Sequence, residues 1–507
     1  MQLYVTPPDF DHDAFMTALG ERFSLKTEDD ISRAQCFYDS FDWRLYKENL
    51  TLVQTGKTFT LRSLEDDTTI SSIRLDHPLV FEWDLPDSGL RDKLKPIIEM
   101  RALLALFEIT SNSRIIRILD DEEKTVARLK ITDSLQGNDN RSAMTKHISL
   151  LPVRGYEKNS RELADFLIEH QFYLTDESIY TRALHSFGKT PGDYSAKPNL
   201  NFTPDMRSDE AAKEIYRFLA SIMRRNEAGV KEDIDTEYLH DFRVSVRRTR
   251  SALSQLKGVF PEDVANRYKD DFRYIGRLTN ELRDLDVYLL SADDYRMMLP
   301  DYLQADIRPL FAFLSKNRVS ALMSVIKGLN SEQYSRIMND WEAYIQEPPE
   351  DTPDAANAAL PVIDLAKSRI YKRYRSILKE GNAITDSSPD DALHNLRINC
   401  KKLRYLLEFF SSLFPKKEIG VIVKQLKRLQ DNLGSFQDLC VQSDTLMAYS
   451  SDPFFSGPEN HKALLAIGCL IGKLDVEKLA VRNAFAKTFE AFSSRDNQVR
   501  FKNLFNH

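Results

Sequence analysis

The stretch Leu239-His240-Asp241-Phe242-Arg243-Val244-Ser245-Val246-Arg247-Arg248-Thr249-Arg250 has a second copy, Leu393-His394-Asn395-Leu396-Arg397-Ile398-Asn399-Cys400-Lys401-Lys402-Leu403-Arg404. Both read Leu-His-x-apolar-Arg, then three intervening residues, two basic residues, one further residue and an arginine. His240 and His394 are 154 residues apart, and the same spacing relates Asp284 to Asp438. A repeat that keeps its register over about forty residues indicates an internal duplication.

Each copy has the period of an amphipathic helix, because successive residues turn by about 100°. The basic faces are His240, Arg243, Arg247 and Arg250 in the first copy, and His394, Arg397, Lys401 and Arg404 in the second. Solvated helices normally mix acids with bases at i,i+4, since like charges repel. A basic solvated surface would explain either helix alone. Two such faces without an acid predict a polyanionic ligand.

The repeated histidine helix, followed by an Arg-Asp-Leu or Gln-Asp-Leu segment, resembles the CHAD family, the conserved histidine α-helical domain. The resemblance covers about 300 residues, from Asp205 to the C-terminus. It implies two four-helix bundles related by a pseudo-twofold axis, with a basic central groove that binds inorganic polyphosphate. It also implies an older alternative, in which the histidines chelate a metal.

Composition places limits on the rest of the chain. Its 507 residues suggest two or three domains, and the four cysteines show no paired spacing, which predicts reduced thiols in a cytoplasmic protein. No apolar run reaches the roughly 18 residues of a membrane span, and the first residues do not read as a secretory signal. The net charge of −7 is uneven: residues 1–205 carry 25 Lys and Arg against 34 Asp and Glu, and the remainder 45 against 43. Local clustering, not net charge, must therefore attract a polyanion.

The first 187 residues predict an antiparallel β-barrel-like domain. Short alternating runs separated by turn-forming residues predict strands at 35–39, 50–54, 58–62, 69–75, 113–119, 125–132 and 144–151. Helices are predicted at 11–23, 90–104 and 161–171. Residues 188–204 contain three prolines and few apolar residues, and are predicted to be a linker.

This part resembles the CYTH family of triphosphate-processing tunnel barrels. The resemblance rests on the segment Phe37–Leu45, with support from Thr58–Arg62 and from Glu108-Ile109 followed by Arg114. A CYTH enzyme opens with Glu-x-Glu-x-Lys, whereas Gln2, Tyr4 and Thr6 stand at the matching places here. These groups cannot replace the carboxylates that Mg²⁺ or Mn²⁺ requires, so we expect no metal-assisted hydrolysis. The sequence still permits a cationic tunnel that binds phosphate. Its expected lining is Arg62, Arg74, Arg114, Arg128 and Lys130.

Residues 205–507 predict an all-α domain, divided into a first repeat (205–346), a connector (347–354) and a second repeat (355–507). Helices are predicted at 208–228, 235–260, 261–283 and 302–329, then at 355–380, 390–414, 416–449 and 459–493. Ser208, Asp235 and Asp390 are candidate N-caps. Asp284 and Asp438 each precede a leucine near a helix end, and are predicted to cap helices or pair with arginines rather than to be catalytic.

The sequence therefore predicts a non-enzymatic protein that binds inorganic polyphosphate, with no cofactor and no metal. Besides the two basic faces, the expected ligands are Arg248, Arg273, Arg277, Lys402, Lys424, Lys427, Arg428, Arg217, Arg224, Lys372 and Lys379. The alternatives are a metal-dependent triphosphatase or polyphosphatase in the N-terminal barrel, a metal site at the histidines, and nucleic-acid binding, which sparse aromatic residues on the basic faces disfavour. We expect association with polyphosphate granules and no membrane contact; the pattern leaves chain-length preference and oligomeric state open.

Overall fold

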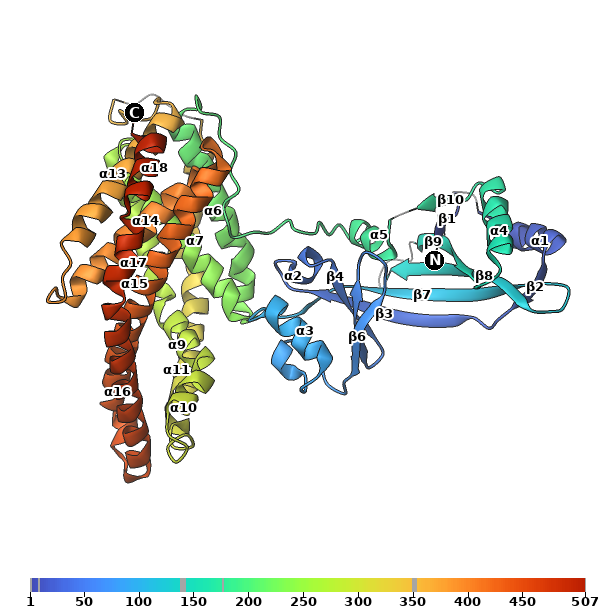
Figure 1. Cartoon of the computed structure of the whole chain (residues 1–507), viewed down its shortest axis with the longest axis horizontal. Helices are drawn as coiled ribbons and strands as arrows, with labels where there is room; N and C mark the ends of the chain where they lie inside the picture. Colours follow the sequence, from blue (N-terminus) through green and yellow to red (C-terminus); the bar gives the residue numbers. More distant parts are fainter. Residues whose placement is uncertain (1, 8–9, 137–142, 176, 349–352, 507) are drawn as a thin grey trace. The chain divides into compact units, whose positions relative to one another are not determined.

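The computed structural model describes residues 2–7, 10–136, 143–175, 177–348 and 353–506 (Figure 1). The chain divides into two compact units, Met1–Ser195 and Ala196–His507. The boundary lies within residues 188–204, which contain no helix or strand. On the N-terminal side of the boundary, Trp43 Nε1 donates a hydrogen bond to Asp193 Oδ1 at 2.9 Å.

The N-terminal unit is built on one antiparallel sheet with the order β10-β1-β9-β8-β7-β3-β4-β5-β6, and β2 also pairs with β7. The long strands are β3 (Ile31–Asp39), β7 (Leu104–Leu119), β8 (Thr125–Gln136) and β9 (Ala143–Pro152). The shorter ones are β1 (Gln2–Val5), β2 (Ser24–Thr27), β4 (Leu50–Thr55), β5 (Thr58–Ser63), β6 (Thr69–Arg74) and β10 (Tyr173–Thr175). The predicted antiparallel sheet is confirmed.

Three apolar clusters hold this sheet together. In the first, helices α1 (His12–Arg22) and α4 (Glu157–Glu169) contribute Leu19 and Phe166, which pack with Leu129 of β8. In the second, helix α3 (Gly89–Ile98) packs Leu90 and Leu94 against β4 and β5. The third contains Ala183 and Leu184 of the short helix α5 (Ile179–Ser186), with residues of β3, β4 and β7. The short helix α2 (Arg44–Lys47) completes the unit.

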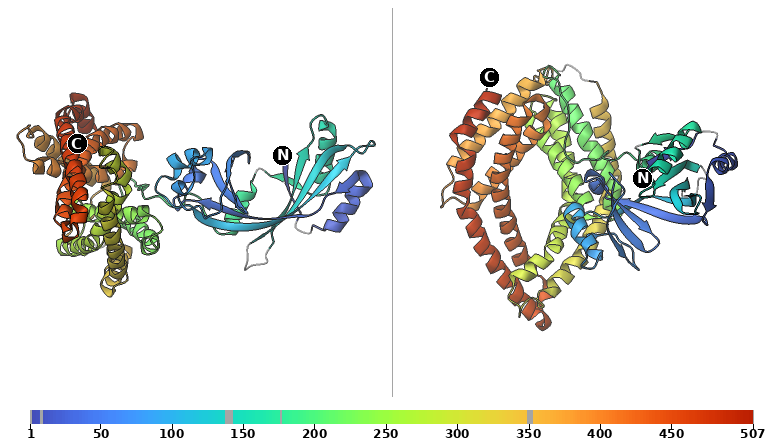
Figure 2. Two further views of the ribbon diagram at one scale, coloured as in Figure 1. Left: turned by 90° about the horizontal axis from the view of Figure 1, so that it is seen from below. Right: turned by 45° about the vertical axis from the view of Figure 1, so that its right-hand side comes forward.

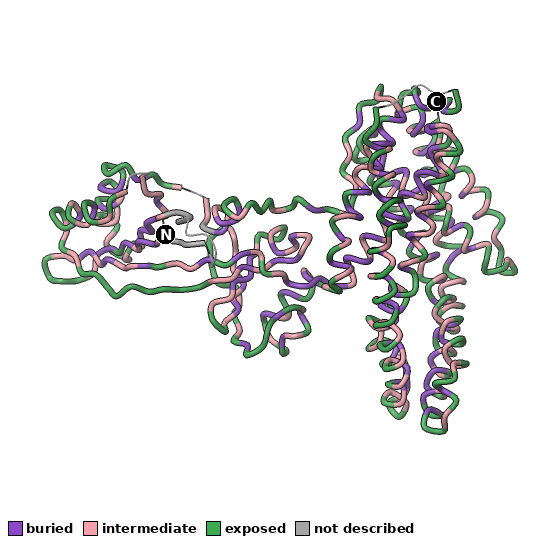
Figure 3. Tube along the Cα trace, turned by 180° about the vertical axis from the view of Figure 1, so that it is seen from behind, coloured by how far each residue is buried: buried purple, intermediate pink, exposed green. Residues whose placement is uncertain are grey.

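The C-terminal unit is helical, as predicted (Figure 2). Its first part contains α6 (Ser208–Lys231), α7 (Thr236–Gln255), α8 (Glu262–Leu278), α9 (Asn280–Leu290), α10 (Ala292–Met298), α11 (Arg308–Leu329) and α12 (Glu332–Gln346). Its second part contains α13 (Val362–Asn382), α14 (Asp390–Phe409), α15 (Lys416–Ser450), α16 (His461–Asn483), α17 (Phe485–Phe492) and α18 (Arg495–Phe505). Buried and exposed residues alternate along the long helices (Figure 3).

Several predicted helix boundaries are wrong, for local reasons. The helix predicted at 261–283 breaks at Thr279, whose backbone (φ −108°, ψ 1°) leaves the helical region. The helix predicted at 90–104 ends at Ile98, because Glu99 adopts a positive φ of 52°. Helices α12 and α18 were not predicted. Residues 349–352 of the predicted connector lie outside the described residues.

Of the three predicted N-caps, one is confirmed and two are wrong. Asp235 caps α7 by accepting hydrogen bonds from the backbone N–H groups of Glu237 and Tyr238, so that prediction is confirmed. Ser208 and Asp390 do not cap: each is the first helical residue, after Arg207 and Pro389 respectively. Within the described part of the chain, no helix combines the length and apolar character needed to cross a membrane.

Candidate functional site

Helix α7 carries the first basic face, and the apolar side next to it fixes its position. Phe242 and Val246 are buried on that side, and Val246 borders the arginines of the basic face. Against α6, the approach is close: a Cβ on Gly229 would lie 2.2 Å from Tyr238 Cδ1. Only glycine permits this contact, which fixes the start of α7 against α6.

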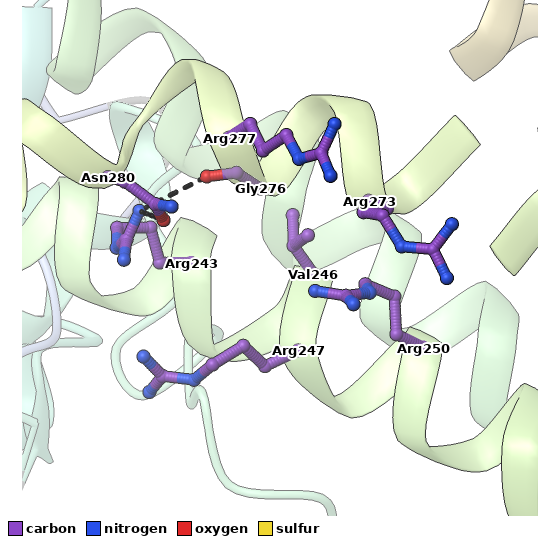
Figure 4. A pocket seen from close by; sticks show the side chains of 8 residues that line it. All are labelled: Arg243, Val246, Arg247, Arg250, Arg273, Gly276, Arg277 and Asn280. Atoms are coloured by element: carbon purple, nitrogen blue, oxygen red, sulfur yellow. Dashed lines mark hydrogen bonds between the residues drawn. The ribbon is translucent and has the colours of Figure 1, made fainter. Parts of the chain in front are cut away.

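Arg243 is the anchored member of the face (Figure 4). Its Nη1 donates to Thr279 Oγ1 at 2.7 Å, to Asn280 Oδ1 at 2.9 Å and to the Gly276 carbonyl at 3.3 Å. Burial, followed by the charge of Arg247, lowers the pKa of Arg243 to about 10. The break between α8 and α9 thus supplies the acceptors that hold this guanidinium.

A pocket of about 370 Å³ opens beside Arg243, between α7 and the α8–α9 junction. Its lining has five arginines and no acid: Arg243, Val246, Arg247, Arg250, Arg273, Gly276, Arg277 and Asn280 (Figure 4). A Cβ on Gly276 would sit 3.7 Å from Val246 Cγ1 and 3.8 Å from Arg250 Nη1, so a larger residue would intrude into the space.

The charges in this pocket are largely uncompensated. Arg273 pairs with Asp270, but no ion pair is found for Arg247, Arg250 or Arg277 within the described residues. Burial lowers the pKa of Arg250, and the nearby Arg273 and Arg277 lower it further. The pocket therefore concentrates positive charge that an anion would stabilise.

The second basic face, on α14, lies near the first. Burial lowers the pKa of Lys401 to about 8, and both Arg397 of its own helix and Arg247 of α7 contribute to that shift. Arg397 Nη2 pairs with Asp438 Oδ1 at 3.1 Å, which confirms the predicted role of Asp438 as an arginine partner. Its repeat equivalent Asp284 lies in the field of Arg243, although burial raises the pKa of Asp284 overall. The two faces thus form one electrostatically connected surface.

The two copies are not equivalent in detail. Gln430, Asp431 and Gly434 of α15 stand where the pocket has Gly276, Arg277 and Asn280, by the spacing of 154. The second copy therefore has the carboxylate Asp431 in place of Arg277. It has Gly434 in place of Asn280, which accepts a hydrogen bond from Arg243 in the first copy. The arginine pocket is a property of the first repeat.

His240 and His394 occupy equivalent places at the start of the two faces. His240 contacts Arg283 of α9 and His394 contacts Gln437 of α15, each 43 residues further on. Arg283 and Gln437 were not predicted as site residues, nor were Thr279 and Asn280. The sequence did contain a signal for Arg283 and Gln437, because each directly precedes the repeated Asp-Leu pair.

Some predicted ligands have partners within the fold. Arg248 is buried, donating to Glu408 Oε2 at 2.6 Å and to the Ala196 carbonyl at 2.7 Å. Arg404 pairs with the same Glu408 at 2.6 Å. Arg217 donates to the Ile345 carbonyl, and Arg224 pairs with Glu342 at 2.8 Å.

The remaining predicted ligands lie elsewhere on the unit. Lys402 is half-buried, and its pKa is lowered by burial and then by Arg373 of α13. Lys372 and Lys379 line a different pocket, on α13. Lys424, Lys427 and Arg428 are exposed on α15, with no ion pair in the described chain.

The N-terminal unit gathers part of its predicted cationic set. Burial lowers the pKa of Lys130, and the charges of Arg33 and Arg62 lower it further, while Arg62 itself pairs with Asp67 at 3.4 Å. Arg114 is instead paired with Asp30 at 2.6 Å, and Arg74 and Arg128 are exposed. Gln2 accepts a hydrogen bond from the Tyr4 hydroxyl at 3.2 Å. Among the described residues, no group of three or more His, Cys, Asp or Glu could hold a metal ion.

Comparison with known proteins assigns the class of the helical unit. Residues 215–447 match the family model described as the CHAD domain, so this part of the chain is a CHAD domain. Two uncharacterized proteins from two strains of Mycobacterium tuberculosis are each 25% identical over 224 residues, a match covering 43% of this chain and 43% of each relative. The matched region thus spans less than half the length of these relatives.

Solved structures of three proteins are similar to parts of the chain. The CHAD domain from the plant Ricinus communis is 25% identical, with 59% of this chain and 96% of that chain covered at a TM-score of 0.49. PptA from Streptomyces chartreusis is 16% identical, with 56% and 100% covered at 0.44. A putative adenylyl cyclase from Hippeastrum with a dominant triphosphatase activity is 16% identical, with 38% and 98% covered at 0.24. With all three TM-scores below 0.5, the CHAD assignment rests on the family model.

The expectation that the protein is not an enzyme is wrong as a general statement. The structures to which the chain is similar include PptA and a protein with triphosphatase activity. That expectation came from Gln2, Tyr4 and Thr6, together with the lack of a recognisable base, nucleophile or metal set in the sequence of the helical part.

Proposed function

We propose that the CHAD domain binds inorganic polyphosphate on the surface formed by α7, the α8–α9 junction and α14. The observation that carries this proposal is the pocket lined by five arginines and no acid. Lys401 lies in the field of Arg247, so the second basic face extends this surface. A linear polymer with a negative charge on every unit matches an extended surface of this kind.

The chemistry of the lining favours phosphate. Guanidinium groups present planar pairs of N–H donors that match phosphate oxygens, while lysine supplies a point charge. Each neutralised phosphate releases a condensed counterion, so affinity should fall steeply with salt. Because Arg243 is already held by three acceptors, it would orient the pocket, and the unpaired Arg247 and Arg277 would take the ligand.

The test compares two double variants of the whole chain. Arg247→Gln with Arg277→Gln removes two exposed, unpaired charges and should weaken long-chain polyphosphate binding at least tenfold, with a salt slope shallower by about two. Arg296→Gln with Arg308→Gln removes the same charge from α10 and α11, outside the pocket lining, and should have little effect. Equal affinities in the two variants, both folded by circular dichroism, would contradict the proposal. Single-stranded RNA provides the comparison for nucleic-acid binding.

The finer architecture belongs to the same proposal. We infer two four-helix bundles related by a pseudo-twofold axis, with α12 and α18 added, because His240–Arg283 and His394–Gln437 are equivalent contacts at the repeat spacing. We infer a CYTH-like barrel for the N-terminal unit, supported by its antiparallel sheet and by the grouping of Arg33, Arg62 and Lys130. Binding polyphosphate would bring the protein to polyphosphate granules.

A further inference from the structure

Helix α13 has a basic face of its own, separate from the faces on α7 and α14. Between Leu365 and Lys379 it carries six cationic residues and no acid: Lys367, Arg369, Lys372, Arg373, Arg375 and Lys379. Ile370, Tyr374 and Ile377 form its buried side. At about 100° per residue, Lys372, Arg375 and Lys379 point away from that side, and all three are exposed.

This face borders two cavities. The larger, about 710 Å³, is lined by Asp364, Lys367, Ser368, Tyr371, Lys372, Arg375, Ser376, Lys379, Phe505 and Asn506. The smaller, about 200 Å³, is lined by Ser254, Gln255, Lys257, Arg369, Lys372, Arg373, Ser376 and Leu406. Lys372 and Ser376 belong to both, so the basic surface runs from the end of α18 across α13 to the end of α7.

The first repeat shows what happens when such cations are satisfied internally. On α6, Lys213 Nζ donates to the Glu347 carbonyl at 2.7 Å and Arg217 Nη1 to the Ile345 carbonyl at 2.7 Å. Arg224 pairs with Glu342 of α12. Helix α12, which packs on α6, and the residue after it thus supply one carboxylate and two backbone carbonyls to these cations.

Helix α18 packs on α13 but does not do the same. It contributes aromatic contacts: the Phe501 ring stacks on Tyr374 with centroids 3.6 Å apart. The ion pair found for α18 within the described residues joins Arg500 to Glu418 of α15. This helix therefore supplies no ion-pair partner to the cations of α13. Throughout the described residues, Lys367, Lys372, Arg375 and Lys379 have no ion pair. Asp364 lines the same cavity but pairs with none of the four in the part of the chain that is described, so a net positive charge is left for a ligand to balance.

We propose that this α13 face is a second binding site for a linear phosphate polyanion. The inference rests on the proposed function and adds a chain-length preference to it. Lysines predominate on the exposed face, and their point charges accept a polymer in many registers, whereas the arginine pocket on α7 fits a short phosphate group. A long chain that occupies both sites gains from effective concentration, which a short chain cannot.

The experiment separates the two sites by ligand length. Lys372→Gln, Arg375→Gln and Lys379→Gln, combined in the whole chain, should lower the affinity for long-chain polyphosphate about tenfold or more and leave tripolyphosphate binding unchanged. The matched control, Lys416→Gln, Lys417→Gln and Lys473→Gln, removes three exposed lysines that line neither cavity, and should bind as wild type. The arginine-pocket variant should lose affinity for both ligands.

The outcomes distinguish the two proposals. Wild-type affinity of the α13 variant for the long chain, beside a weakened arginine-pocket variant, would overturn the second site only. Wild-type affinity in both variants would overturn the proposed function as well. Loss of single-stranded RNA binding in the α13 variant, with polyphosphate affinity unchanged, would also overturn the inference, because the ligand class would be wrong.

Discussion

His240 Nδ1 accepts a hydrogen bond from Arg283 Nη2 at 3.0 Å, and this fixes the protonation state of that ring nitrogen. A guanidinium only donates, so Nδ1 must be without a proton. The repeat-equivalent contact has the opposite sense, because His394 Nδ1 donates to Gln437 Oε1 at 2.5 Å. The second histidine can gain a proton on Nε2 and keep its hydrogen bond. The first loses its hydrogen bond when Nδ1 is protonated.

This asymmetry gives the two histidines different roles in binding. The sequence pattern predicts that protonation of both histidines strengthens polyanion binding. We now expect His394→Ala to weaken polyphosphate binding, because His394 can donate from Nε2 while Nδ1 keeps its bond to Gln437, and His240→Ala to have a smaller effect. Calorimetric titration at constant ionic strength measures both. Equal effects of the two substitutions would contradict the assignment, and zinc binding that competes with polyphosphate would favour the metal hypothesis.

Lys401 should make binding depend on pH at the alkaline end. Its pKa is lowered to about 8 by burial and by neighbouring cations, so a substantial fraction is neutral near that pH. A bound phosphate favours the charged form, so binding takes up a proton and affinity falls as the pH rises through about 8. Lys401→Arg keeps its charge, since arginine titrates above about pH 12, and should flatten this fall. Titrations in two buffers of different ionisation enthalpy would detect the proton; identical enthalpies would refute the uptake.

Arg248 should prove structural rather than a ligand. Its guanidinium joins Glu408 to the Ala196 carbonyl in a buried setting, and Arg404 also holds Glu408. Arg248→Met should lower the free energy of unfolding by about 3 kcal/mol, because it leaves a half-paired carboxylate in the interior. Urea denaturation measures this change, and polyphosphate titration of the folded variant should give wild-type affinity. A variant with wild-type stability and weakened binding would restore Arg248 to the site.

His147 should make the N-terminal unit sensitive to acid. It is buried on β9, and burial, with Arg182 and Lys130 nearby, lowers its pKa from 6.5 to about 4. The neutral ring is therefore favoured in the folded state. Its contribution is fully present above about pH 6.5 and is lost as the pH falls toward 4, by about 3 kcal/mol in total. Pulse proteolysis in urea, with mass spectrometry of fragments from residues 1–195, measures this; His147→Gln should flatten the profile between those pH values.

Local patterns predicted elements more reliably than boundaries. The two basic helices, the long helix α15 and the antiparallel sheet follow from periodicity, because a buried stripe or face imposes its repeat on the sequence. Two helices end earlier than predicted, at Thr279 and Glu99, because these residues adopt non-helical backbone conformations. Nothing in the local sequence indicated those conformations. Helices α12 and α18 were not predicted. The sequence therefore did not indicate that α12 supplies partners to the cations of α6, whereas α18 forms no ion pair with those of α13 among the described residues.

The sequence by itself determined the duplication, the cationic faces and the placement of His240 and His394, because these depend on spacing along one helix. Only the tertiary structure decided which charges remain available. The sequence pattern predicted three ligands that have partners within the fold: Arg217, Arg224 and Arg248. They donate to carbonyls and carboxylates of residues as far as 160 positions away. Arg247 and Arg277 meet at one pocket because α7 packs against α8. A cation's partners come from whichever helices pack beside it, and that neighbourhood is a property of the fold.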